Sequence, residues 1–311
     1  MREATFAGNP PRLTVSLRIP LRSFAFIVGL LVTGAAFAQA VSIVDDRGRE
    51  IRLAGPARRV VALAPSLAEL AFAAGAGGRL VGVARFSDFP PAARELPQVG
   101  DAARVDLERV VALRPDLILA WKSGNAAGDV DRLERLGYPA FVSEPARLAD
   151  IPRLLRAIGV LAGTLAAAGD AAADFEREIR ALRSRHAKAR KVRVFYLIWH
   201  RPLLTVNGAH MISDVIALCG GVNVFADVNL LTPPVTLEAV IAARPQVILG
   251  GASAGGEKEF AGQWRASGVP PLTGLPAYYV NPDIIQRQTP RVVEGAKAVC
   301  SALDDVRRGR R

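Results

Sequence analysis

Residues 107–121 read LERVVALRPDLILAW, and this stretch predicts a helix, a tight turn and a buried strand in direct succession. Its first half places apolar residues at close to helical spacing, at Leu107, Val110, Val111 and Leu113. Asp106 comes just before the helix and can cap its free backbone N–H groups. The Arg-Pro pair at residues 114–115 ends the helix, because a residue before proline avoids the α region. The run DLILAW that follows is typical of a buried strand in a parallel sheet.

Nearly the same stretch occurs again at residues 237–251, which read LEAVIAARPQVILGG. Thr236 takes the place of Asp106 as the capping residue. A second related pair lies upstream, since residues 68–83 and 213–228 each predict a helix, a glycine-rich helix end and a short strand. Two related units at domain-sized separation predict an α/β protein of two lobes, each with a mostly parallel sheet.

The predicted boundaries follow from these units. Residues 41–165 form the N-terminal lobe, with a β-hairpin at 41–55, and residues 192–311 form the C-terminal lobe with a basic tail. Between them, residues 166–191 predict one linking α-helix. A helix of ~20 residues is roughly 30 Å long, enough to cross a lobe. We therefore expect a stiff, bilobal protein with a ligand cleft between the lobes.

The N-terminus, residues 1–40, has the pattern of a secretory signal peptide. Arg18 and Arg22 precede an apolar run at residues 24–38, and small residues follow it, so cleavage is expected after Ala38 or Ala40. The alternative is a membrane anchor, but a spanning helix needs about 20 apolar residues and this run is shorter. The sequence thus predicts export to the periplasm.

The composition, 50% hydrophobic and 22% charged, is that of a globular protein. The net charge of +11 is concentrated in the leader, in residues 183–193 and in the tail RRGRR. We interpret residues 183–193 as the solvated end of a helix and expect the tail to be disordered. Because no basic stripe is interleaved with aromatic residues, nucleic acid is not an expected partner.

Three large aromatic residues stand at or after predicted strand ends, and ligands of parallel α/β sheets bind beyond the carboxyl ends of the strands. Phe86 follows one strand, while Trp121 and Trp199 close two others. We expect them to line one groove, the alternative being that each packs in the core. Trp264 lies in a helical stretch and is expected to pack in the core.

No catalytic or metal-binding motif was found, so we predict neither catalytic residues nor metal ligands. His186, His200 and His210 are dispersed, and a single imidazole such as His200 is a weak metal site. Cys219 and Cys300 are expected to pair, as two cysteines in an exported chain usually do, the alternative being two buried thiols.

The segment from FSDFPP, residues 86–91, to LERVVALRPDLILAWKSGN, residues 107–125, resembles the periplasmic cobalamin-binding proteins of ABC importers. The similarity continues through residues 222–228, 236–251 and 283–300, and covers nearly all of residues 57–305. It implies a helix-linked bilobal fold and a monomeric periplasmic shuttle that delivers cobalamin, or a related corrinoid, to the permease dimer of an ABC transporter.

The resemblance also implies roles for individual residues. By position, the corrinoid contacts would be Phe86 (a tyrosine in the best-known relatives), Trp121, Asp283 and Arg287. Cys219 and Cys300 match the family's disulfide. Glu108 and Glu238 match the acidic residues on the lobe tips that meet permease arginines. The chain departs from the pattern in having Ala102 and Thr232 in place of tryptophans, and Trp199 has no counterpart in the relatives.

Two alternatives to cobalamin remain open. Haem and ferric siderophores are anionic and would favour a cleft rich in Arg or Lys, whereas the sequence places only Arg287 there, with Lys122 as a further candidate. A metallocluster reductase or chelatase of similar fold would want cysteine ligands or a catalytic His/Asp set. We therefore predict a binding protein that is not an enzyme, with cobalamin as its transported ligand and no cofactor of its own.

Overall fold

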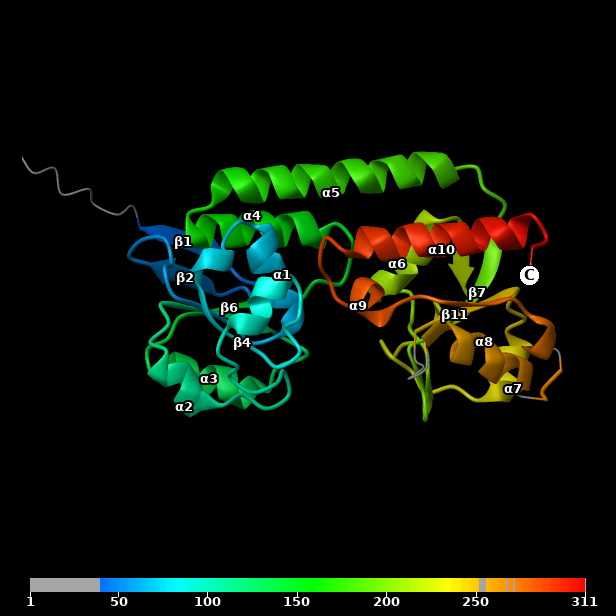
Figure 1. The fold of residues 1–311 in the computed structure, drawn as a ribbon, viewed down its shortest axis with the longest axis horizontal. Coiled ribbons are helices and arrows are strands. Elements are labelled where there is room, and N and C mark those ends of the chain that lie inside the picture. Colours follow the sequence, from blue (N-terminus) through cyan, green and yellow to red (C-terminus); the bar gives the residue numbers. More distant parts are fainter. Residues whose placement is uncertain (1–39, 252–255, 267, 271, 311) are drawn as a thin grey trace, which may run out of the picture. The chain divides into compact units, whose positions relative to one another are not determined.

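Two four-stranded parallel β-sheets, one in each half of the chain, organise the fold (Figure 1). The computed structural model describes residues 40–251, 256–266, 268–270 and 272–310, and all of them belong to one contact unit. The predicted signal peptide lies outside these residues except for Ala40. None of the helices within the described ranges has both the length and the apolar character needed to cross a membrane.

The N-terminal lobe is built on a parallel sheet flanked by helices. Its strand order is β4 (Leu80–Val83), β3 (Val60–Ala62), β5 (Leu117–Trp121), β6 (Ala140–Ser143). The helices of this lobe are α1 (Pro65–Ala73), α2 (Leu107–Ala112), α3 (Ala127–Arg135) and α4 (Asp150–Ala162), with 3₁₀ turns at Gly77–Arg79 and Pro91–Glu95. The predicted hairpin is present as the antiparallel pair β1 (Val41–Val44) and β2 (Glu50–Leu53).

The C-terminal lobe repeats this plan. Its strand order is β10 (Gly221–Asn223), β7 (Val192–Leu197), β11 (Val247–Gly250), β12 (Ala277–Tyr279). Its helices are α6 (Met211–Leu218), α7 (Leu237–Ala242), α8 (Gly256–Ala266), α9 (Pro282–Ile285) and α10 (Val292–Arg307), with a 3₁₀ turn at Leu272–Gly274. A small antiparallel pair, β8 (Trp199–His200) and β9 (Leu203–Leu204), follows β7. The predicted fold class, two α/β lobes with parallel sheets, is confirmed.

The repeated stretch of the sequence has equivalent positions in the two lobes. The unit α2–β5 and the unit α7–β11 each supply the third strand of their sheet. Asp106 accepts a hydrogen bond from the Arg109 N–H, and Thr236 accepts one from the Ala239 N–H, so both predicted helix caps are formed. Arg114 and Arg244, the residues before proline, both have positive φ, at 44° and 46°. The two copies therefore share helix start, helix end and strand position.

One long helix, α5 (Leu165–His186), follows the N-terminal lobe. It packs against α4 of the first lobe and against α10 of the second (Figure 1). Its buried side chains recur at helical steps and form one stripe: Ala168, Ala172, Phe175, Ile179, Leu182 and His186. The helix thus contributes to a single apolar core cluster that includes residues of both lobes.

The expectation of a disordered basic tail is wrong for residues 307–310. Arg307 is the last residue of α10, and its guanidinium donates to the backbone carbonyls of Cys219 (2.7 Å) and Arg190 (2.9 Å). The next arginine, Arg308, donates to Asp305 at 2.8 Å. These arginines are ordered because they donate hydrogen bonds to carbonyls and a carboxylate. Most of these partners are distant in sequence, so the sequence pattern could not predict them.

Candidate ligand-binding site

Phe86 lies in the loop after β4, with its ring in solvent. Its side chain is 67% exposed, although phenylalanine is normally buried. Its φ of 67° lies in the left-handed region, which is costly for a residue other than glycine and often marks a functional loop. Phe89, in the same loop, is also exposed. The loop therefore presents two aromatic rings to solvent beyond the carboxyl end of a parallel strand.

Trp121 closes β5, as predicted, but its ring is only partly accessible. The indole packs against the main core, and a Cβ built on Gly124 would lie 1.8 Å from it. The Trp121 backbone N–H donates to the Asn125 side chain at 2.7 Å, which fixes this turn. The indole Nε1 is buried and has no hydrogen-bond partner. The ring is therefore both a core residue and a donor that a ligand could satisfy.

Trp199 was predicted to close a strand, and this prediction is wrong. Strand β7 ends at Leu197, and Trp199 pairs with Leu204 in the short hairpin β8–β9. The reason is that the Ile198 N–H donates to the Leu204 carbonyl at 3.0 Å across this hairpin, so the chain has already left the sheet before Trp199. Trp199 is 54% exposed, and its indole donates to the Arg201 carbonyl. It is an exposed aromatic of the C-terminal lobe, while Trp264 is buried against Phe195 as expected.

Five charged residues and one threonine from the two lobes meet beside the Phe86 loop in what we term the cross-lobe cluster: Glu69, Asp88, Asp283, Arg287, Thr289 and Arg291. Arg287 Nη1 lies 2.8 Å from Glu69 Oε1 and 2.6 Å from Asp88 Oδ1, and its Nη2 lies 2.8 Å from Asp283 Oδ1. The Thr289 hydroxyl donates to Glu69 Oε2 at 3.0 Å. Arg291 lies 3.3 Å from Glu69 Oε1. Glu69 is thus held by three groups of the other lobe.

Burial and pairing set the ionisation of this cluster. The Glu69 side chain is 2% exposed. Burial by itself raises the pKa of Asp88, but the hydrogen bond and charge of Arg287 outweigh it, so the pKa lies below its ordinary value. Burial acts to lower the pKa of Arg287, but bonds to Asp88 and Glu69 raise it. Asp88 and Arg287 therefore form an ion pair at neutral pH.

The structure brings Asp283 and Arg287 together, as one ion pair within the cluster, and places them beside the Phe86 loop, since Arg287 Nη2 approaches the Phe86 carbonyl at 3.5 Å. Glu69 and Asp88 were not among the predicted site residues. The only signal for Glu69 was a single acid within the otherwise apolar helix AELAFAAG. Buried acids are rare unless they are paired, so an acid at this position indicates a basic or hydrogen-bonding partner elsewhere in the chain.

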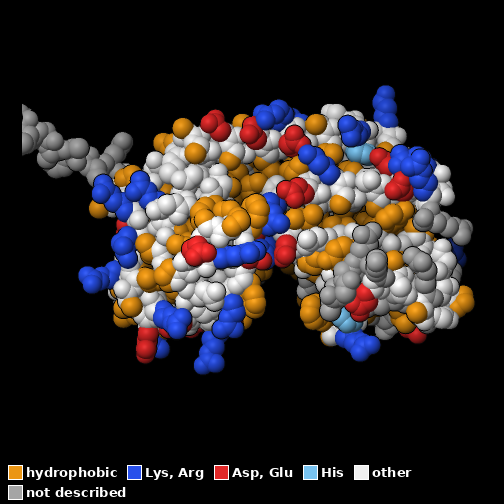
Figure 2. All heavy atoms as spheres, in the orientation of Figure 1, with side chains coloured by type: hydrophobic (Ala, Val, Ile, Leu, Met, Phe, Trp, Pro, Cys, Tyr) orange, Lys and Arg blue, Asp and Glu red, His pale blue; other side chains and the backbone are white. Residues whose placement is uncertain are grey.

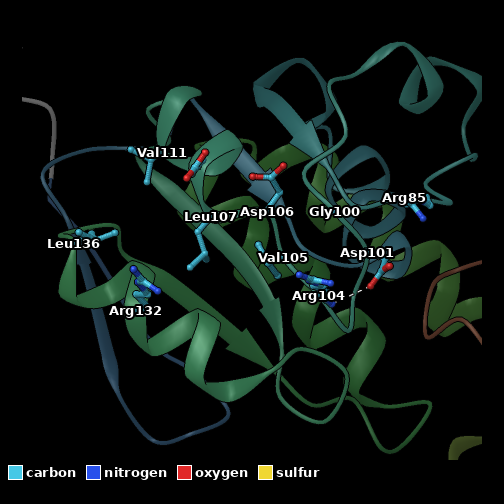
Figure 3. Close-up of a pocket in the computed structure, with 11 residues that line it drawn as sticks. Arg85, Gly100, Asp101, Arg104, Val105, Asp106, Leu107, Val111, Arg132 and Leu136 are labelled. Atoms are coloured by element: carbon cyan, nitrogen blue, oxygen red, sulfur yellow. Dashed lines mark hydrogen bonds between the residues drawn. The ribbon is translucent and has the colours of Figure 1, made fainter.

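Glu108 and Glu238 lie in the first turns of α2 and α7, and both are exposed. Hydrogen bonds from its own N–H and from the Thr236 hydroxyl lower the pKa of Glu238. Beside Glu108 the N-terminal lobe has a depression of about 620 Å³, lined among others by Arg85, Arg104 and Leu136 (Figure 3). Phe86, Trp121 and Trp199 do not line it. It belongs to the tip that carries Glu108.

Figure 2 shows the surface hollowed between the two lobes, and charged and apolar side chains gather above that hollow. Among the described residues, no group of three His, Cys, Asp or Glu could hold a metal ion. The His200 ring lies beside Trp199, and its Nδ1 is buried without a partner. The arrangement can offer aromatic faces and neutral hydrogen-bonding groups to a ligand.

A disulfide joins Cys219, at the end of α6, to Cys300 in α10, with their Cα atoms 4.7 Å apart. It connects two helices of the C-terminal lobe across 81 positions of sequence. Both residues are buried, so the bridge is part of the core of that lobe.

Residues 60–278 match the family described as periplasmic binding protein. The chain belongs to this family. It is 35% identical over 255 residues to the vitamin B12-binding protein of Vibrio parahaemolyticus, an alignment that covers 82% of this chain and 92% of that protein. It is also 35% identical over 250 residues to the vitamin B12-binding protein of a Yersinia pestis strain, covering 80% and 88%.

Solved structures show the same relationship. The periplasmic vitamin B12 binding protein of Vibrio cholerae superposes with a TM-score of 0.74 at 34% identity, covering 81% of this chain and 98% of that one. A periplasmic heme-binding protein from Roseiflexus sp. RS-1 superposes with a TM-score of 0.71 at 23% identity, covering 80% and 98%. The second similarity concerns the fold alone. Proteins named for binding vitamin B12 and for binding heme therefore share one architecture.

Proposed function

We propose that this protein is a periplasmic substrate-binding protein that captures cobalamin in the cleft between its lobes and delivers it to the permease of an ABC transporter. The observation that carries the proposal is the 34–35% identity to vitamin B12-binding proteins over 80–82% of the chain. The protein acts by binding and release, without catalysis and without a cofactor of its own, and works as a monomer.

The chemistry of the site supports this ligand. Cobalamin has flat, partly apolar faces and many neutral amides, and a cleft with aromatic faces and few free charges suits it. Phe86, Trp121 and Trp199 supply the aromatic faces, with Asp283 and Arg287 beside them. Haem or a ferric siderophore is the second candidate, favoured by the fold shared with heme-binding proteins. Against this candidate, the Arg287 guanidinium is already bound to three carboxylates.

A visible spectrum of the exported protein tests the ligand directly. The protein is purified from cells supplied with both cobalamin and haemin, and calorimetry with cyanocobalamin follows on the stripped protein. Corrin absorption bands and saturable binding are expected. A haem Soret band without corrin bands would assign the protein to haem instead. Mass spectrometry of the same sample tests the export prediction, which requires an N-terminus after Ala38 or Ala40.

We infer that Glu108 and Glu238 dock the protein on the permease. An acid in the first turn stabilises its own helix, and this role does not require the same acid in both lobes. Two related lobes that face a twofold partner, in contrast, would each present one carboxylate. Both residues occupy the first turn of equivalent helices, and both are exposed. The tips would then meet basic pockets of a symmetric permease dimer.

Reconstituted uptake with Glu108→Ala, Glu238→Ala and the double variant tests docking. Each single variant should keep its cobalamin affinity and lose transport, and the double variant should lose more. Raised salt should weaken docking of the unmodified protein, because exposed charges are screened. Asp170→Ala, an exposed acid on α5, is the matched control. Wild-type uptake by the double variant would leave the two glutamates with only a capping role.

A further inference from the structure

The cross-lobe cluster borders the Phe86 loop directly. Asp88 follows Phe86 by two residues, and Arg287 Nη2 approaches the Phe86 carbonyl at 3.5 Å. Arg291 stacks on the Phe89 ring, with its guanidinium carbon 4.0 Å from the ring centroid. Phe86 and Phe89 are both exposed. A ligand lying on these rings would therefore feel the charges of the cluster at short range.

Positive charge in the cluster is fully compensated. Two arginines, Arg287 and Arg291, form its ion pairs, and three carboxylates, Glu69, Asp88 and Asp283, face them. A further arginine, Arg94, donates to the Asp88 backbone carbonyl at 3.2 Å, and its charge also lowers the pKa of Asp88. Counted with Arg94, three arginines face three carboxylates. The arginines of this cluster, which anionic chelates would need, are thus already bound by the protein's own acids.

One neutral polar group next to the ion pairs is, in contrast, available. Ser87 precedes Asp88 and is 6% exposed, and its buried hydroxyl has no hydrogen-bond partner. Buried polar atoms normally find a partner, so this hydroxyl indicates a ligand or water at this place. A hydroxyl matches the amides of a ligand and gives a carboxylate no counter-charge.

We propose that Glu69 and Asp88 are specificity-determining residues, which neutralise Arg287 and Arg291 and so select neutral, amide-bearing corrinoids against carboxylate-bearing ligands of similar size. This inference rests on the proposed function and adds the basis of ligand selection to it. Glu69 neutralises the arginines from the buried side, since its side chain is 2% exposed. Asp88 neutralises Arg287 from the solvent side, since its side chain is 43% exposed. Removing either acid leaves a net positive charge that attracts an anionic ligand.

Charge can be varied on the ligand without changing its shape. The probes are cyanocobalamin and its monocarboxylic derivatives, each with one propionamide hydrolysed to a propionate, titrated by calorimetry at low ionic strength. The proteins are the unmodified chain, Glu69→Gln, Asp88→Asn and the control Asp170→Asn, which removes one exposed acid on α5. Thermal melting shows that each variant is folded, and Asp88→Asn carries the test if Glu69→Gln does not fold.

The unmodified protein should bind at least one of the monocarboxylic derivatives less tightly than it binds cyanocobalamin. The ratio of the two affinities, taken for the derivative that binds most weakly, is the penalty. In Glu69→Gln and Asp88→Asn this penalty should shrink by about tenfold, as expected for one unit charge across ~10 Å at an effective dielectric constant of ~20. Asp170→Asn should keep it. An equal penalty in all four proteins, or none in the unmodified protein, overturns the proposal while leaving cobalamin binding intact. A protein that binds no cyanocobalamin refutes the proposed function and this proposal together.

Discussion

His210 makes the stability of the C-terminal lobe depend on pH. This residue precedes α6, and its Nδ1 accepts a hydrogen bond from the Ile212 N–H at 3.2 Å, which caps the helix. Only a neutral imidazole can accept this bond, because both nitrogens of the protonated ring are donors. Burial lowers the pKa of His210 from its ordinary value of 6.5 to about 4. Lowering the pH therefore favours the unfolded chain.

The size of the effect follows from these two pKa values. Between about pH 4 and pH 6.5 the unfolded chain binds more protons at His210 than the folded protein, so stability rises with pH. The contribution is fully present above pH 6.5 and is lost as the pH falls through that range. From pH 7.5 to pH 5 the free energy of unfolding should drop by up to about 2 kcal/mol. Partial solvent exposure of the ring makes this an upper figure.

Urea unfolding of the unmodified protein and of His210→Asn, at pH 7.5 and pH 5, measures the contribution of His210 to the free energy of unfolding. Asparagine is a good helix cap that does not titrate in this range, and all other groups are common to both proteins. The unmodified protein should lose up to about 2 kcal/mol more than the variant on going to pH 5. Equal losses in the two proteins would mean that His210 is protonated freely in the folded state.

Three further predictions concern the groove and the core. Trp121→Ala should weaken cobalamin binding by ~1–3 kcal/mol, the range for a buried aromatic anchor, and unchanged affinity by calorimetry would assign Trp121 to the core alone. Gly124→Ala should have a similar effect, because the added Cβ would lie 1.8 Å from the indole, whereas Gly128→Ala, with open space around it, should bind normally. Replacing Cys219 and Cys300 by alanine releases a loop of 81 positions and should reduce the free energy of unfolding in urea by about 4–5 kcal/mol in the chain-entropy picture. A loss near zero would contradict that picture.

Local features of the fold could be predicted from the sequence because they are set by neighbouring residues. Asp106 and Thr236 cap their helices within three residues, and the Arg-Pro pairs end them. The short apolar runs that follow these pairs predicted the strands β5 and β11 at the positions where the structure has them. The hairpin that holds Trp199 was missed, because a buried strand and the start of a hairpin both read as apolar runs.

The candidate site could be predicted only in part, since much of it depends on contacts between distant residues. The bond between Arg287 and Glu69 spans 218 positions, and no periodicity records such a pairing. Arg287 could be named as a charged group at the cleft, but its partners decide what it can bind. A free guanidinium would attract an anion, and this one is neutralised by acids from both lobes.

The repeated stretch, residues 107–121 and 237–251, shows at which positions the two lobes are alike and at which they differ. Glu108 and Glu238 occupy the same place in both copies, at the exposed start of the helix. Trp121 at the end of the first copy corresponds to Gly251 in the second, where a Cβ would meet the Val280 carbonyl at 2.4 Å. The helix tips are thus alike, while the strand ends differ. A twofold permease that touches the tips and an asymmetric ligand that touches the strand ends would together require this distribution.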